Sequence, residues 1–143
     1  MINFLDIDAP QIANVLHFVE EGVTDFKEER RPDWKPEHVY GSLFLGFAQL
    51  TIIMEEDTPI GFMVSRWMVQ THDGQNYLHV WLFYLTKEAR GRLGEITKPA
   101  IDYMWQKCEP RGAFLEVPTT RGGWEKYLKP EMELEQLTFR KRA

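Results

Sequence analysis

The sequence predicts an α/β fold in which a twisted, mixed but mainly antiparallel sheet is flanked by helices on both faces. Three observations predict it. Two segments with helical spacing of apolar residues come first, three apolar segments separated by short polar turns follow, and the third of these leads through a basic, glycine-containing turn into another amphipathic helix. Short turns between apolar segments are typical of a meander of antiparallel strands.

The first expected elements are a strand at Ile2–Ile7 and a helix after it. Asp8 is a suitable N-cap, Pro10 falls in the first turn, and Gln11 stands where a capping box has its glutamine. Gly22 is expected to end this helix. The apolar positions that predict it are Ile12, Val15, Leu16 and Val19.

A second helix is expected after a polar loop. Residues 27–35 are charged and interrupted by proline, which predicts a loop, and Pro36 is suited to open the next helix. The apolar residues assigned to this helix are Val39, Tyr40, Leu43, Phe44 and Phe47.

Three strands form the centre of the predicted sheet. Residues 50–54 and 60–69 are expected to form a hairpin through the acidic turn 55–59, and a second turn at residues 72–75 leads to a strand at residues 77–85. This last strand is apolar at almost every position, so it is predicted to be central and buried on both faces.

The remaining elements follow the basic turn. An amphipathic helix is expected next, with Pro99 early in it, where the ring is expected to delay or kink the helix. A short strand at residues 113–117, a short helix at 124–128 and a last strand at 132–140 complete the predicted order. The apolar residues of the amphipathic helix are Ile96, Ala100, Ile101, Met104 and Trp105.

Composition limits the classes of function. The 143 residues are expected to form a single domain, 1–143, and one cysteine, Cys108, excludes an internal disulfide. The four histidines have no metal-ligand spacing, so no metal site is expected. A net charge of −5 argues against nucleic acid as a partner. No apolar run is long enough to span a bilayer and no basic leader is present, so no membrane partner and a cytoplasmic location are expected.

The end of the central strand is the most informative segment. A strand that enters a helix through a basic turn brings backbone N–H groups and a helix N-terminus together beside Arg90 and Arg92. Guanidinium groups match phosphate oxygens in geometry and charge. The segment therefore predicts a site for the phosphate of a nucleotide-like cofactor, and the alternative is an ordinary solvated helix start.

This order of elements resembles the GCN5-related N-acetyltransferase (GNAT) superfamily along nearly the whole chain. Three motifs carry the resemblance: an acidic turn before an apolar-Gly-Phe strand start at residues 55–62, an arginine-started loop at 85–94, and the segment Trp-Glu-Lys-Tyr-Leu-Lys-Pro at 124–130. The loop is a degenerate form of the family's cofactor signature, since the fourth and sixth positions from Arg90 are not glycine. The resemblance implies that acetyl-CoA is held by Leu85, Thr86, Arg90, Gly91, Arg92, Leu93 and Gly94.

The resemblance also implies a reaction, the transfer of an acetyl group from acetyl-CoA to an amine on a small molecule or a protein. His79 and Glu116 are the candidate general bases, and Tyr127 is the candidate general acid because Trp124 stands where the family often has a tyrosine. Strict alternation puts His79 on the face of its strand that carries Trp81 and Phe83. The alternative roles are a packed histidine and an exposed strand carboxylate.

Two other functions stay open at this point. One is a catalytically inactive protein of the same fold that serves as a binding or accessory protein, for example one encoded by a phage. The other is a small-molecule binding α+β domain unrelated to the family. A homodimer is also open, and the sequence does not identify the acceptor.

Overall fold

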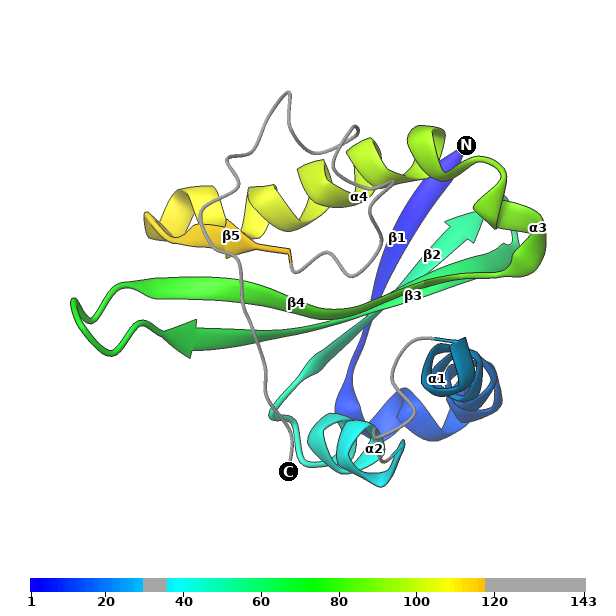
Figure 1. Ribbon diagram of the computed structural model, residues 1–143, viewed down its shortest axis with the longest axis horizontal. Helices are drawn as coiled ribbons and strands as arrows, with labels where there is room; N and C mark the ends of the chain where they lie inside the picture. The colour runs from blue at the N-terminus through cyan, green and yellow to red at the C-terminus, as the bar shows by residue number, and fades with distance from the viewer. Residues whose placement is uncertain (30–35, 118–143) are drawn as a thin grey trace.

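The computed structural model describes residues 1–29 and 36–117, and these form one five-stranded sheet with helices on both faces (Figure 1). The strands lie in chain order, with β1 to β4 antiparallel to their neighbours and β5 parallel to β4. This is the mixed, mainly antiparallel, twisted sheet that the sequence predicts. The strands are β1 (Ile2–Ile7), β2 (Gln49–Glu55), β3 (Thr58–Val69), β4 (Asn76–Leu85) and β5 (Phe114–Glu116).

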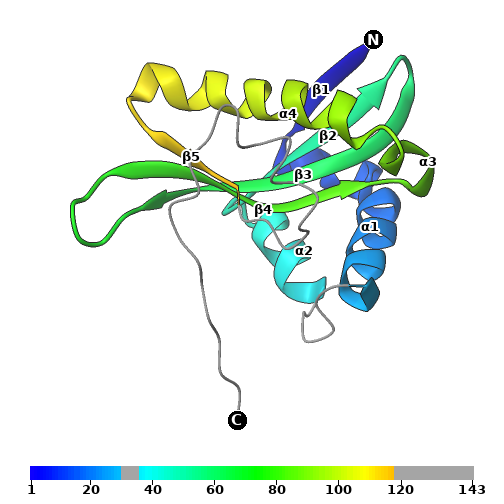
Figure 2. The same ribbon diagram turned by 45° about the horizontal axis from the view of Figure 1, so that its top comes forward.

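The helices separate into two layers. α1 and α2 cover one face of the sheet and α4 covers the other, as both views show (Figures 1 and 2). The turn after β4 forms one helical turn, α3, before α4 begins. The helical segments are the 3-10 helix η1 (Ala9–Asn14), α1 (Leu16–Glu29), α2 (Pro36–Phe44), α3 (Lys87–Arg90), α4 (Leu93–Cys108) and the 3-10 helix η2 (Glu109–Arg111).

Each face of the sheet has its own hydrophobic core. On the α4 face, Ile96, Ala100 and Met104 of the helix pack against side chains that include Met63 and Val80. On the other face, buried residues of α1 and α2 pack against a separate set of strand side chains. That set includes Ile52, Phe62, Val64, Leu82 and Tyr84. The central strands therefore supply apolar side chains to both cores, which explains their continuous apolar sequence.

Gly22 does not end the first helix, so that prediction was wrong. α1 runs through Gly22 to Glu29, and it therefore includes the first residues of the predicted 27–35 loop. A Cβ atom at Gly22 would lie 2.4 Å from Cε1 of Phe62 and 2.7 Å from Cδ2 of Tyr84. The glycine permits close packing of helix on sheet here rather than a left-handed helix end.

Two further boundaries differ from the prediction. α2 opens at Pro36 as expected but ends at Phe44, so the exposed Phe47 lies beyond it. α4 starts at Leu93 and contains Pro99 in its interior, so of the two expected effects of the proline ring, a later start or a kink, the later start was wrong. The predicted helix 124–128 and strand 132–140 lie outside the described residues. Within residues 1–29 and 36–117, no helix combines the length and hydrophobicity needed to cross a lipid bilayer.

A β-bulge in β4 changes which side chains share a face. Val64 pairs with Leu82 and Ser65 pairs with Val80, so the register between the two strands passes over Trp81. Trp81 therefore packs on the α1/α2 face, whereas Phe83 packs on the α4 face. The prediction that His79 shares a face with both was wrong for Phe83, because the extra residue shifts the alternation by one.

Candidate functional site

In the part of the chain that the structure describes, β5 pairs with only the first part of β4. The three residues of β5 pair with Tyr77, Leu78 and His79 only. β4 continues for six more residues and then enters the turn that leads to α3 and α4. The described part of the β4–β5 ladder therefore ends at the pair His79 and Glu116.

His79 and Glu116 meet at the end of this ladder. They are register partners across the parallel pair, and Nδ1 of His79 lies 2.6 Å from Oε1 of Glu116. Because a carboxylate can only accept, the imidazole donates through Nδ1–H, which leaves Nε2 as the nitrogen able to take a proton. The side chain of His79 is 16 % exposed and that of Glu116 is 44 % exposed, so the pair lies at the border between core and solvent. The two candidate bases therefore form one hydrogen-bonded pair.

Arg66 extends this pair into a row across three strands. It is the β3 register partner of His79, and its guanidinium carbon lies 5.0 Å from the centroid of the Trp81 ring. Its Nε is buried and has no hydrogen-bond partner among the residues that the structure describes. No sequence pattern marks this residue, because only the strand register brings it beside His79.

Arg90 is held against the sheet. Its Nε–H donates to the carbonyl oxygen of Leu85 at 3.0 Å, and its guanidinium lies 4.0 Å from the carboxylate of Asp25 on α1. The guanidinium carbon also lies 5.8 Å from the centroid of the Tyr84 ring. One of the two arginines expected at the phosphate site is therefore directed at the end of β4 and at α1.

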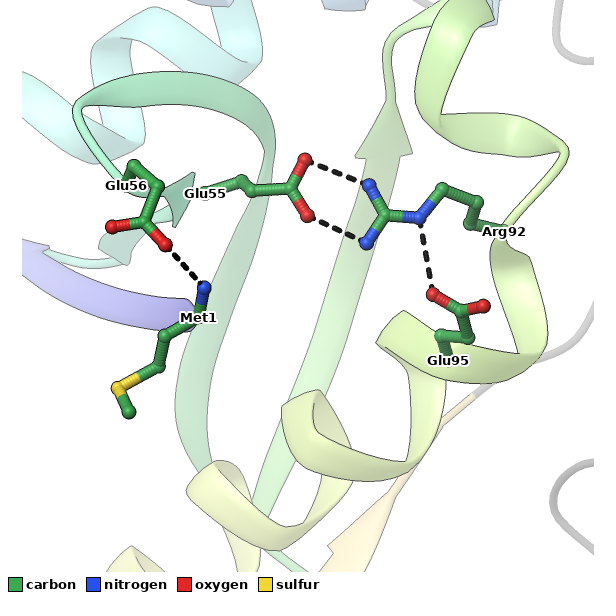
Figure 3. Close-up of polar contacts among 5 residues, drawn as sticks. All are labelled: Met1, Glu55, Glu56, Arg92 and Glu95. Atoms are coloured by element: carbon green, nitrogen blue, oxygen red, sulfur yellow. Dashed lines mark hydrogen bonds and ion pairs between the residues drawn. The ribbon is translucent and has the colours of Figure 1, made fainter.

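Arg92 is bound by two carboxylates (Figure 3). Its two terminal nitrogens contact the two oxygens of Glu55 at 2.7 and 2.5 Å, and its Nε–H donates to Glu95 at 3.1 Å. The hydrogen bonds that Arg92 donates to Glu55 and Glu95 raise the pKa of Arg92, and its bond to Glu55 lowers the pKa of Glu55. Glu55 lies at the end of β2, far from Arg92 in sequence, and was not among the predicted site residues.

The backbone of the turn joins sheet and helix. The N–H of Thr86 donates to the carbonyl of Ile60 at 2.9 Å, and the carbonyl of Thr86 accepts from the N–H groups of Ala89 and Arg90. A Cβ atom at Gly91 would meet no atom within 4 Å, so the turn is open at this residue. Leu93 and Gly94 form the start of α4, where the first N–H groups of a helix have no acceptor within it. The predicted cofactor residues thus extend from the end of β4 through α3 to the N-terminus of α4.

The surface of α1 beside this turn is acidic. Tyr84 donates from its phenol to Asp25 at 3.2 Å, and burial, together with the negative charge of Asp25, raises the pKa of Tyr84 to about 12. A shallow depression along α1 contains Asp25, and its lining residues are His17, Glu20, Glu21, Thr24 and Asp25. Negative charge at this position favours a cationic group over an anion.

Of the predicted catalytic residues, His79 and Glu116 are in direct contact, and Tyr127 lies outside the described residues.

No protein-family model matches the chain, and no curated protein sequence matches it significantly. The comparison with solved structures does find matches.

Acetyltransferase structures match the chain from end to end. A ribosomal-protein-alanine N-acetyltransferase from Brucella melitensis biovar Abortus 2308 superposes with a TM-score of 0.72 at 16% identity, covering 100% of this chain and 99% of that one. A predicted acetyltransferase with acetyl-CoA from Clostridium acetobutylicum gives 0.67 at 15% identity, covering 98% and 96%. An aminoglycoside acetyltransferase from an uncultured soil metagenomic sample gives 0.67 at 14%, covering 100% and 99%. Similarity of this extent at such low identity establishes a shared architecture, and the chain has the fold of the GCN5-related N-acetyltransferases.

Proposed function

We propose that this protein transfers an acetyl group from acetyl-CoA to an amine carried by a small molecule or a protein. The observation that carries the proposal is the His79–Glu116 pair at the end of the β4–β5 ladder. An imidazole held by a carboxylate is a suitable base, and a strand edge beside it is a suitable track for an extended acyl carrier. The fold shared with acetyltransferases supports the same reaction.

The proposed reaction is direct attack within a ternary complex. Nε2 of His79 takes a proton from the acceptor, directly or through one water, and Glu116 stabilises the imidazolium that forms. The amine nitrogen attacks the thioester carbonyl carbon, a backbone N–H of β4 stabilises the oxyanion, and the C–S bond then breaks. Tyr127 is proposed to protonate the departing CoA thiolate. The products are an amide and free CoA.

The turn after β4 is the proposed cofactor site. The end of β4 would offer backbone groups to the pantetheine arm, and the first-turn N–H groups of α4 would donate to the pyrophosphate. The open space at Gly91 leaves room for this approach. The residues proposed for cofactor binding are Leu85, Thr86, Arg90, Gly91, Arg92, Leu93 and Gly94.

A turnover assay tests the proposal. Release of the CoA thiol is measured with acetyl-CoA and three amines: a polyamine, an aminoglycoside and a peptide with a free N-terminus. For the amine that reacts, His79→Ala should lower kcat about a hundredfold, because it removes the base, and should leave acetyl-CoA affinity unchanged. The control is His38→Ala, since His38 is exposed on α2. Wild-type kcat in His79→Ala would contradict the proposed role of the pair.

A catalytically inactive binding protein is the second candidate, and one observation favours it. Arg92, which would help to hold the pyrophosphate, is already bound by Glu55 and Glu95. Binding of acetyl-CoA in calorimetry, with no thiol released for any of the three amines, would support this candidate over the enzyme.

A further inference from the structure

The guanidinium of Arg92 has few donors left for a phosphate group. Of its five N–H groups, one bonds Glu95 and at least two bond the oxygens of Glu55. The contact with Glu55 joins both terminal nitrogens to both carboxylate oxygens, which is the strong, two-pronged geometry of arginine and carboxylate (Figure 3). Glu55 therefore occupies the two terminal nitrogens of the guanidinium, which are the donors that would otherwise bind two oxygens of a phosphate.

The charges around Arg92 also oppose a phosphate. One guanidinium and two carboxylates give this cluster a net charge of −1. Glu95 lies in the first turn of α4, where its carboxylate already interacts favourably with the positive end of the helix. A pyrophosphate at this helix end would have to displace Glu55 from Arg92 or approach two negative charges.

The two acidic residues come from different elements, so Glu55 can be substituted without changing the sequence of α4. Glu95 is three residues from Arg92 on the same segment, whereas Glu55 reaches it from the end of β2. The side chain of Glu55 is 32 % exposed, so it can be changed without opening the core. Its neighbour Glu56 instead contacts the amino group of Met1 at 2.6 Å, and that pair is exposed.

We propose that Glu55 restrains acetyl-CoA binding by holding Arg92 in this ion pair, so that the affinity of the turn for the cofactor is set by competition between a carboxylate of β2 and the pyrophosphate. This inference rests on the proposed function. Neutralising Glu55 frees two N–H groups of Arg92 and removes one negative charge from the site. Acetyl-CoA should then bind more tightly.

Calorimetric titration with acetyl-CoA tests the inference on the wild-type chain, on the single variants Glu55→Gln, Glu56→Gln and Arg92→Ala, and on the double variant that combines Glu55→Gln with Arg92→Ala. Glu55→Gln should tighten binding by about two- to fivefold, the effect expected for one partly exposed ion pair. Glu56→Gln is the matched control, because it removes the same charge one residue away without touching Arg92, and its affinity should equal that of the wild type. In the Arg92→Ala background, Glu55→Gln should lose most of its effect.

The outcomes separate this inference from the proposed function. Equal or weaker binding by Glu55→Gln, with a wild type that binds, would overturn the role of Glu55 and leave acetyl-CoA binding intact. Equal tightening by Glu56→Gln would also overturn it, because the effect would then be one of net charge. No binding by any variant would contradict the proposed function and this inference with it. Melting temperatures without ligand verify that each variant is folded.

Discussion

At the scale of single residues, Gly22 has the clearest physical role. It lies where α1 contacts the rings of Phe62 and Tyr84, and an added methyl group would overlap both. We expect Gly22→Ala to lower the free energy of unfolding by about 1–3 kcal/mol, because overpacking outweighs the better helix propensity of alanine. Gly41→Ala in α2 is the matched control, since nothing lies within 4 Å of its Cβ position. It should be neutral or stabilising by up to about 1 kcal/mol. Urea unfolding of both variants measures this, and a stabilised Gly22→Ala would contradict the packing argument.

Asp6 joins the first strand to α4. Its carboxylate accepts from Lys107 at 2.7 Å and from Thr51 at 2.8 Å. Burial raises the pKa of Asp6, but the hydrogen bonds from Lys107 and Thr51 outweigh it and hold the pKa below its ordinary value. A carboxylate with a lower pKa in the folded state stabilises the protein above its unfolded pKa of about 4. That stabilisation is lost as the pH falls through the folded pKa.

We therefore expect Asp6→Asn to lower the free energy of unfolding by about 1 kcal/mol at pH 7, a value that allows for partial solvent screening. The difference from the wild type should shrink as the pH is lowered toward about 3. Asp102→Asn serves as the control, because Asp102 pairs with Lys98 on the exposed side of α4 at 3.7 Å. Its effect should stay below about 0.5 kcal/mol. A difference for Asp6→Asn that does not change with pH would show that the charge of Asp6 is not what stabilises the fold.

At the scale of elements, β3 and β4 form the most protected part of the sheet. Phe62, Val64 and Leu82 are almost completely buried, and both strands have helices on either side. Hydrogen exchange should therefore be slowest for those amides of residues 62–64 and 82–85 that form hydrogen bonds between β3 and β4, because exposing them requires nearly global unfolding. Residues 71–73 of the β3–β4 turn should exchange much faster. Rapid labelling of the 82–85 segment in mass spectrometry would contradict a central position for β4.

The bulge in β4 is the element that alternation could not predict. A period of two places His79, Trp81 and Phe83 on one face, and the one-residue shift in register moves Phe83 to the other face. Trp81 is large and apolar like its neighbours, so nothing in its identity marks an irregularity. Bulges depend on the register with the partner strand, which residue identity in one strand does not specify.

At the scale of the whole molecule, the architecture could be predicted to a large extent. Apolar periodicity, the two hairpin turns and the basic turn after the central strand specify the order of elements up to residue 117, and the structure confirms the mixed sheet with helices on both faces. The errors concern element ends. Gly22, Phe47 and Pro99 were interpreted from local preferences, and tertiary packing overrides such preferences.

For the candidate site too, the sequence determines the position of each residue along the chain, and the fold determines which residues are in contact. The sequence by itself determined that His79 lies on the central strand, that Glu116 lies on the next strand, and that Arg90 and Arg92 follow the strand end, because these are facts of position along the chain. Only the tertiary structure decided that His79 contacts Glu116 and that Arg92 contacts Glu55. Both contacts join residues 37 positions apart. Strand register and the packing of α4 on the sheet create such contacts, and they depend on the whole chain rather than on any local pattern.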